Sequence, residues 1–197
     1  SLWGAVPFAD HVLGADEYQL PNGDIPTMWA WVEQNLTEAA AVLPSKSGIN
    51  GQQAIGARLT KEAALAFLGK AQIFQEKYAE AATSLKSVIN SNKYDLVADF
   101  SQLLRSANDF GPENIFESNA INDPDNAWSQ GTMLFSLMIN WRSDHLTGMP
   151  EGIWNTGWGF FNPTKSLYEA FVAMEGPEGY RLTNTMKTRE QMGGGWA

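Results

Sequence analysis

The sequence TKEAALAFLGKAQIFQEKYAEAATSLKSVIN, residues 60–90, contains the clearest helical pattern in the chain. Thr60 is a suitable N-cap, and Glu62 places a negative charge in the first turn, where it interacts favourably with the helix dipole. Apolar residues then recur at helical spacing in two runs, first Ala64, Phe67, Leu68, Ala71 and Phe74, and then Tyr78, Ala81, Ala82, Leu85, Val88 and Ile89. A polar break at residues 75–77 separates the runs, and Asn-Ser-Asn follows the second. This stretch therefore predicts two antiparallel helices joined by a tight turn.

The spacing inside this helix pair matches one tetratricopeptide unit. In such a unit a large residue, a leucine and a small residue follow one another on the first helix, which Leu65, Leu68 and Gly69 satisfy, while Tyr78 and Ala81 fit the second helix. We therefore expect Leu68, Gly69 and Ala81 to form the close contact between the helices. The chain contains no second clear copy, and an ordinary helical hairpin remains the alternative interpretation.

Other segments extend the helical prediction on both sides of the pair. A helix is expected over 27–43, opened by Pro26 and closed by Pro44, so that residues 27–92 form a helical, tetratricopeptide-like region. A further helix is expected within 162–174, with Asn162 as the cap, Pro163 at its first position and Gly176 after its end. Residues 114–117 resemble a short strand, residues 131–139 a short helix, and the rest of 112–161 long loops. The fold class predicted is mainly α, with long irregular loops and a few short strands.

Composition excludes several functional classes. The 197 residues are 44% hydrophobic and 18% charged, which is typical of a globular chain with a sizeable core. A net charge of -9 argues against binding to nucleic acid or anionic lipid. The chain has no cysteine, so it contains no disulfide, thiolate metal site, cysteine nucleophile or lipid-anchored cysteine. It also has no apolar run of the roughly 18 residues needed to cross a bilayer.

Residues suited to catalysis or metal binding are few. The two histidines, His11 and His145, are far apart in sequence, and no metalloprotease helix, nucleophile elbow or phosphate-binding loop is present. Acidic pairs occur at Asp123 with Asp125, and at Asp144 beside His145. Paired carboxylates could bind calcium or hydrolyse a glycoside, but a solvated turn is the simpler interpretation of the first pair. We predict no enzyme, no cofactor and no metal site.

A cluster of tryptophans is the most informative candidate site. Trp128, Trp141 and Trp154 stand in polar loops beside Asn126, Arg142, Asp144 and Asn155. The flat, apolar face of an indole can stack on the C–H face of a sugar, while amide, carboxylate and guanidinium groups bind the hydroxyls. Trp158 adjoins the glycine-rich entry to the last helix and is expected to be a packing residue. The alternative is that all four rings belong to the core or to an interface.

Several separated segments together resemble one family, the SusD/RagB nutrient-binding lipoproteins of bacterial outer membranes. The matching segments span most of the chain: WGAVPF at 3–8, WVEQNLTEAAAVLP at 31–44, RLTKEAAL at 58–65, YAEA at 78–81, VIN at 88–90, YDL at 94–96, PENIFE at 112–117, GFFNPT at 159–164, AF at 170–171 and RL at 181–182. Two features depart from the family. Full members are several hundred residues long, with a lipidated N-terminal cysteine, so this chain is similar to the middle of such a protein. The acidic residue that the family has two positions before Arg181 is Gly179 here.

The resemblance implies a fold and a function. It implies a SusD-like α/α superhelix, with residues 1–197 as one domain fragment, and a non-enzymatic protein on the extracellular face of the outer membrane. Such a protein captures an oligosaccharide or polysaccharide and delivers it to a SusC-like, TonB-dependent transporter, and it meets the membrane only through a lipid anchor that this chain lacks. Ligand loops vary between members, so the binding residues predicted from their chemistry are Trp128, Trp141, Arg142, Asp144, Trp154 and Asn155. The alternative function is a tetratricopeptide-like scaffold for protein binding without a glycan site.

Overall fold

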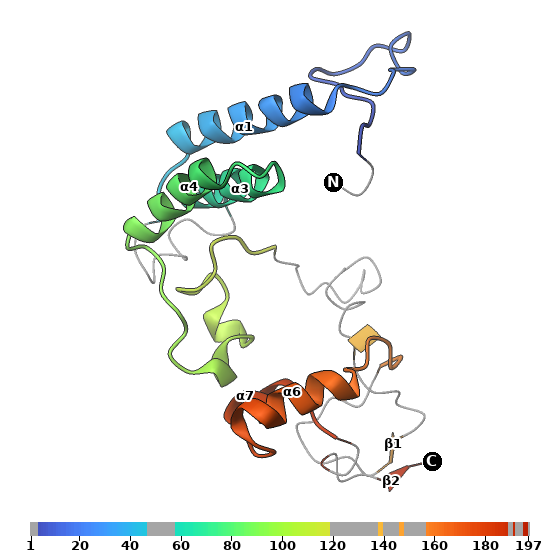
Figure 1. Cartoon of the computed structure of the whole chain (residues 1–197), viewed down its shortest axis with the longest axis vertical. Helices are drawn as coiled ribbons and strands as arrows, with labels where there is room; N and C mark the ends of the chain where they lie inside the picture. Colours follow the sequence, from blue (N-terminus) through green and yellow to red (C-terminus); the bar gives the residue numbers. More distant parts are fainter. Residues whose placement is uncertain are drawn as a thin grey trace. The chain divides into compact units, whose positions relative to one another are not determined.

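A computed structural model describes residues 4–46, 58–118, 138–139, 146–147, 157–188, 191 and 195–196 (Figure 1). The chain divides into two compact units. Unit 1 comprises Ser1–Ala98 and Leu104–Glu117, and unit 2 comprises Asp99–Leu103 and Ser118–Ala197. None of the helices within the described residues has both the length and the apolar character that a bilayer crossing requires.

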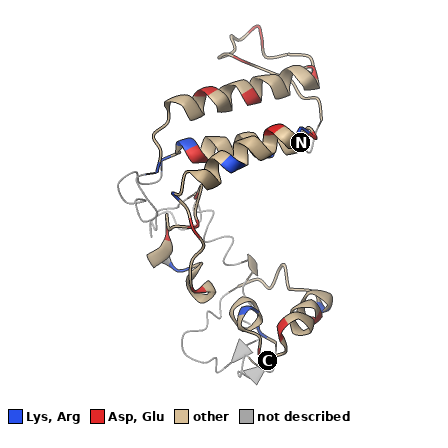
Figure 2. Cartoon of the chain, turned by 60° about the vertical axis from the view of Figure 1, so that its left-hand side comes forward, with Lys and Arg blue, Asp and Glu red and all other residues tan. Residues whose placement is uncertain are grey.

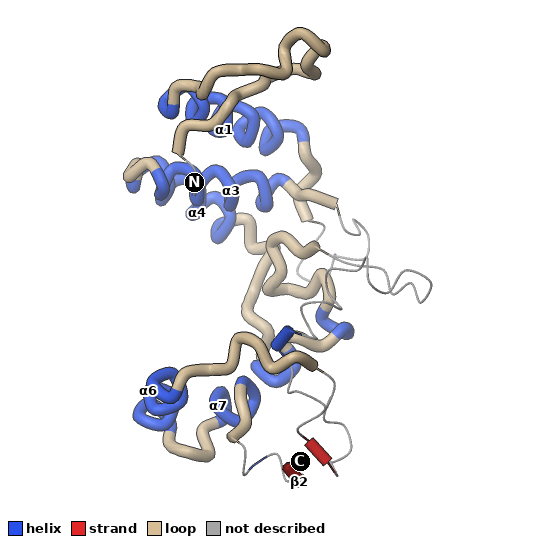
Figure 3. Tube along the Cα trace, turned by 90° about the vertical axis from the view of Figure 1, so that its right-hand side faces the viewer, coloured by secondary structure: helices blue, strands red, loops and turns tan. Residues whose placement is uncertain are grey.

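The described part of unit 1 contains three α-helices. They are α1 (Ile25–Val42), α3 (Lys61–Phe74) and α4 (Tyr78–Asn90), and α3 contacts both of the others (Figures 1 and 3). The antiparallel pair predicted from residues 60–90 is confirmed, including the cap, because the Oγ1 of Thr60 accepts a hydrogen bond from the backbone N–H of Ala63 at 3.2 Å. The third predicted helix, α1, is also confirmed, with Asp24 as its cap through a bond from the Thr27 N–H at 3.1 Å.

The α3–α4 interface is built around Gly69, as predicted. Leu68, Gly69 and Ala81 are all buried, and Ala81 retains only 2% of its exposure. A Cβ at position 69 would lie 2.7 Å from Cγ and 2.8 Å from Cδ2 of Leu85, and 3.5 Å from the carbonyl oxygen of Ala81. The two distances to Leu85 are below ordinary carbon contacts, so any side chain at position 69 would require Leu85 to shift.

A charged contact ties α1 to the turn between α3 and α4. The carboxylate of Glu33 on α1 pairs with the ammonium group of Lys77 and also accepts a hydrogen bond from Nε2 of Gln75 at 2.7 Å. The hydrogen bond from Lys77 is the main cause of a lowered pKa of Glu33. The polar break predicted at residues 75–77 therefore also docks the neighbouring helix.

Lys46 joins three segments of unit 1 from a buried position. Its backbone N–H donates to Glu62 at 3.1 Å, its Nζ donates to the carbonyl of Gly111 at 2.8 Å, and the same Nζ lies 4.6 Å from the centre of the Tyr94 ring. Burial lowers the pKa of Lys46 and raises that of Tyr94. Because each partner is held by a different segment, this cluster fixes Tyr94 and Gly111 against the start of α3.

The strand predicted at residues 114–117 does not form. Asn114 lies in a turn, and its amide donates to the carboxylate of Glu117 and to the carbonyl of Asn108 at 3.4 Å. Glu117 also accepts from the backbone N–H of Phe110 at 2.7 Å. The prediction was wrong because these side chains satisfy nearby polar groups in turns, which compete with a strand ladder.

Unit 2 contains two helices in its described part. They are α6 (Lys165–Glu175) and α7 (Tyr180–Thr185), which contact each other, and α7 also contacts the short 3₁₀ turn η1 (Phe100–Gln102) (Figure 3). Leu182 on α7 is 1% exposed. The hydroxyl of Tyr180 donates to Asp99, which caps η1. Strands β1 (Leu146–Thr147) and β2 (Gly195–Trp196) form an antiparallel pair.

The start of α6 differs from the sequence prediction, whereas its end agrees with it. The cap is Thr164 rather than Asn162, because Oγ1 of Thr164 accepts from the Leu167 N–H at 3.3 Å while the Asn162 amide donates to the Gly159 carbonyl at 2.8 Å. The helix ends at Gly176, as predicted, with φ of 82°.

Glu175 supplies the acidic group that Gly179 lacks. Its carboxylate accepts a hydrogen bond from the backbone N–H of Arg181 at 3.1 Å and lies 3.5 Å from Nε of the same residue. A Cβ at Gly179 would lie 2.1 Å from Cγ of Glu175, so the carboxylate can reach α7 only because position 179 has no side chain. The acidic partner of Arg181 is thus Glu175, six positions before it.

Candidate functional site

The predicted glycan-binding residues lie outside the described residues. These are Trp128, Trp141, Arg142, Asp144, Trp154 and Asn155, and the acidic pair Asp123 and Asp125 lies outside them as well. Of the short helix expected near 131–139, residues 138 and 139 are described and are helical. The predicted binding residues remain a prediction.

An exposed aromatic turn is the candidate site that the structure does describe. The aromatic turn, residues 158–162, contains Trp158, Phe160 and Phe161, whose exposed fractions are 39%, 51% and 69%. The rings of Trp158 and Phe160 meet edge to face, with centroids 6.0 Å apart and an interplanar angle of 62°. Trp158 therefore does pack against another residue, as the sequence suggested, but it does so at the surface rather than in a core.

The backbone of the aromatic turn is held in an unusual conformation. Gly159 has φ of 68° and Phe161 has φ of 54°, the left-handed region that a bulky side chain rarely adopts. The hydrogen bond from Asn162 to the Gly159 carbonyl closes the turn, and the Phe160 N–H donates to the carbonyl of Met138 at 2.7 Å. These two residues flank Phe160, and only Gly159 is a residue type that signals positive φ in the sequence.

A second candidate is an apolar groove between α1 and α3. The groove, of about 400 Å³, is lined by Trp29, Trp31, Val32, Asn35, Leu36, Phe67, Lys70, Ala71 and Phe74. Phe74 is 62% exposed and stacks on Trp29, with centroids 6.4 Å apart. The walls offer almost no hydrogen-bonding surface, so the groove is suited to apolar side chains rather than to sugar hydroxyls. Figure 2 shows acidic residues and no basic residue along α1.

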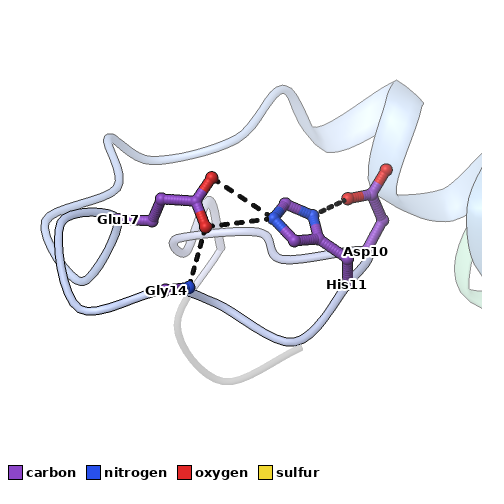
Figure 4. A network of polar contacts seen from close by, with 4 residues as sticks. All are labelled: Asp10, His11, Gly14 and Glu17. Atoms are coloured by element: carbon purple, nitrogen blue, oxygen red, sulfur yellow. Dashed lines mark hydrogen bonds and ion pairs between the residues drawn. The ribbon is translucent and has the colours of Figure 1, made fainter.

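The third feature is a polar cluster around His11 in the loop before α1 (Figure 4). Nδ1 of His11 lies 2.8 Å from Asp10, Nε2 lies 3.4 Å from both carboxylate oxygens of Glu17, and Glu17 accepts from the Gly14 N–H at 2.8 Å. The bond to Asp10, followed by that to Glu17, raises the pKa of His11. Because the carboxylates occupy opposite ring nitrogens, the cluster fastens the loop and does not converge on one ion. Across the described ranges, no group of three or more histidine, aspartate or glutamate side chains could hold a metal ion.

Comparison with known proteins gives a clear structural match and no sequence match. No protein-family profile and no curated protein matches the sequence. Solved structures that match the fold include a SusD-like protein from Bacteroides fragilis (23% identity, TM-score 0.65), a SusD-like carbohydrate-binding protein from the same species (22%, 0.63) and surface glycan-binding protein A from Bacteroides fluxus (22%, 0.65). They cover 88%, 85% and 84% of this chain. The chain has a SusD-like fold.

The SusD-like match extends over both described units but only over part of each neighbour. The chain spans 32%, 29% and 35% of the three neighbouring chains. The expected fold class, mainly α with tetratricopeptide-like helices, is therefore confirmed. The shared fold places the helices but identifies no binding residue, because recognition in a fold depends on loops that differ at this level of identity.

Proposed function

We propose that this protein binds carbohydrate without modifying it. In this proposal it captures an oligosaccharide or polysaccharide at the extracellular face of the outer membrane and delivers it to a SusC-like, TonB-dependent transporter. A lipid anchor on a longer form of the protein would hold it at the membrane. The observation that carries the proposal is the SusD-like fold, because two of the three neighbouring structures are described as binding carbohydrate or glycan.

The composition of the chain supports the same proposal. Its aromatic content of 12% supplies flat rings for stacking on sugars, and its net charge of -9 favours neutral or cationic ligands over polyanions. We propose Trp128, Trp141 and Trp154 as stacking residues, and Arg142, Asp144 and Asn155 as hydrogen-bonding partners of the sugar hydroxyls. Burying about 80 Å² of one ring would contribute about 2 kcal/mol at roughly 25 cal/mol per Å².

Alanine variants of the three tryptophans test these assignments. Affinity electrophoresis against a panel of neutral polysaccharides provides the binding readout, and thermal unfolding provides the stability readout. A stacking tryptophan should lose about 1–3 kcal/mol of binding free energy with little change in melting temperature. A core tryptophan should instead lose about 3–5 kcal/mol of folding free energy. Wild-type mobility for all three variants would place the glycan site elsewhere in the protein.

The apolar groove favours a second candidate function, a scaffold for protein binding. An amphipathic helix could bury its apolar face between α1 and α3, where Phe67 and Phe74 are 40% and 62% exposed. Replacing Phe74 with glutamate would place a charge in this groove and should abolish binding of such a helix. Binding to a partner protein that is sensitive to this change but insensitive to loss of Trp128 and Trp141 would favour the scaffold over the glycan receptor.

A further inference from the structure

We propose that the aromatic turn, residues 158–162, is a stacking subsite for one uncharged pyranose unit of a glycan. This inference rests on the proposed carbohydrate-binding function and assigns part of it to residues that the structure describes. The subsite is formed by the rings of Trp158, Phe160 and Phe161, with Asn162 beside them. It contains none of the three tryptophans proposed above, of which Trp154 lies four positions before Trp158.

The ring geometry leaves aromatic surface available for a ligand. In the edge-to-face pair of Trp158 and Phe160, one ring uses an edge and the other uses one face, so each ring retains at least one face for stacking. Phe161 is the most exposed of the three at 69% and adds a third ring from the same short segment. A sugar presents an apolar C–H face of about the area of one ring, which suits a platform of this size.

The backbone strain points to function rather than to packing. A turn that needs a residue in the left-handed region is normally served by glycine or asparagine, yet position 161 is phenylalanine with φ of 54°. Strained residues of this kind persist where a side chain is required in one place, and they cluster at ligand sites. Since the Phe161 ring is mostly exposed, core packing does not account for it. The bonds from Asn162 to Gly159 and from Phe160 to Met138 hold the turn in this conformation.

The charge around the turn selects a neutral ligand. Residues 157–164 contain no charged side chain. On the following helices Lys165 is paired with Glu169, and Arg181 with Glu175, so neither cation is offered alone to an anionic sugar. The amide of Asn162 donates to Gly159 through Nδ2 and retains Oδ1 as an acceptor for a hydroxyl group. Stacking with one polar contact is the chemistry expected for an uncharged pyranose.

Titration calorimetry of the whole 197-residue chain tests the subsite, with the neutral polysaccharide that wild type retains most strongly in affinity electrophoresis. We expect Trp158→Ala and Phe161→Ala each to raise Kd by about tenfold, which corresponds to ~1.4 kcal/mol. Trp158→Phe keeps a ring and should restore most of the affinity. Tyr18→Ala removes an equally exposed ring from unit 1 (71%, against 69% for Phe161) and should leave Kd unchanged.

The outcomes separate this subsite from the proposed function as a whole. Binding by wild type that is unchanged in Trp158→Ala and Phe161→Ala would overturn the subsite and leave carbohydrate binding intact. No binding by wild type to any polysaccharide in the panel would refute both. Phe161→Asn keeps a residue that tolerates positive φ, so its fold should survive even where alanine disturbs the turn. If Phe161→Asn and Trp158→Ala both lower the melting temperature while the folded protein keeps wild-type Kd, the rings are packing residues and the subsite is refuted.

Discussion

Replacing Gly69 with alanine should destabilise the protein even though alanine is the better helix former. The change would add a Cβ at 2.7 Å and 2.8 Å from Cγ and Cδ2 of Leu85, where carbon atoms normally approach to about 3.5–4.0 Å. Overpacking of this kind costs about 1–3 kcal/mol, whereas alanine in place of glycine within a helix contributes about 1 kcal/mol of stability. We expect a net loss of about 0–2 kcal/mol for Gly69→Ala, and a larger loss for Gly69→Leu.

A double-mutant cycle with Leu85 removes the ambiguity of so small a net effect. In a Leu85→Ala background the atoms that a Cβ would meet are gone, so Gly69→Ala should become stabilising by about 0.5–1 kcal/mol. The coupling between the two positions should then be about 1–3 kcal/mol. Urea unfolding followed by far-ultraviolet circular dichroism measures all four proteins. Ala82→Leu, on the exposed side of α4, is the control and should change stability by no more than about 0.5 kcal/mol.

Two results would refute the close-contact interpretation. The first is a Gly69→Ala variant that is more stable than wild type by the full helix-propensity gain of about 1 kcal/mol. The second is additivity within about 0.3–0.5 kcal/mol in the cycle with Leu85, because residues in contact should not be independent.

Two further predictions concern the loop before α1 and the start of α7. The raised pKa of His11 means that its contribution to loop order is complete below the ordinary histidine value of 6.5 and is lost as pH rises through the raised value. An NMR titration should therefore place the His11 midpoint above 6.5, and Glu17→Gln should lower it; a midpoint at or below 6.5 would contradict the cluster. Glu175→Ala should destabilise the protein by about 0.5–2 kcal/mol through loss of the bond at the start of α7. Gly179→Asp should restore stability in that variant but reduce it in wild type, where Cγ of Glu175 occupies the space; equal effects in both backgrounds, measured by thermal unfolding, would show that the two positions do not exchange roles.

The helices of unit 1 could be predicted from the sequence because their signals are local. Capping by Thr60 and the apolar spacing after it act within one or two turns of a helix, and both were confirmed in α3. The glycine at position 69 also indicated the close contact between α3 and α4, since two helices approach closely where a side chain is absent. The predicted helix ends lie within a few residues of the observed ones. The cap of α6 is Thr164 rather than Asn162 because the Thr164 hydroxyl accepts from a backbone N–H of the first turn, whereas the Asn162 amide bonds to Gly159 instead.

Long-range polar contacts were not visible in the sequence. Nothing local to Lys46 indicates that it will be buried against Gly111, 65 positions later, because that contact depends on where the chain returns after α4. The strand predicted at residues 114–117 was wrong for the same reason, since its formation also depends on which segments lie nearby in the tertiary structure. An apolar pair between polar residues suits a strand only where a neighbouring strand is present, whereas the tertiary structure offers Asn114 and Glu117 nearer partners in turns.

The sequence by itself determined the helical class of this protein and the pairing of α3 with α4, because capping and helical spacing act over short distances. Only the tertiary structure decided which aromatic rings remain at the surface. Trp158 and Phe161 have the same apolar character as rings in a core, yet they are 39% and 69% exposed. Side-chain chemistry is a property of the residue, but exposure depends on every segment that folds over it, and that information is distributed along the whole chain.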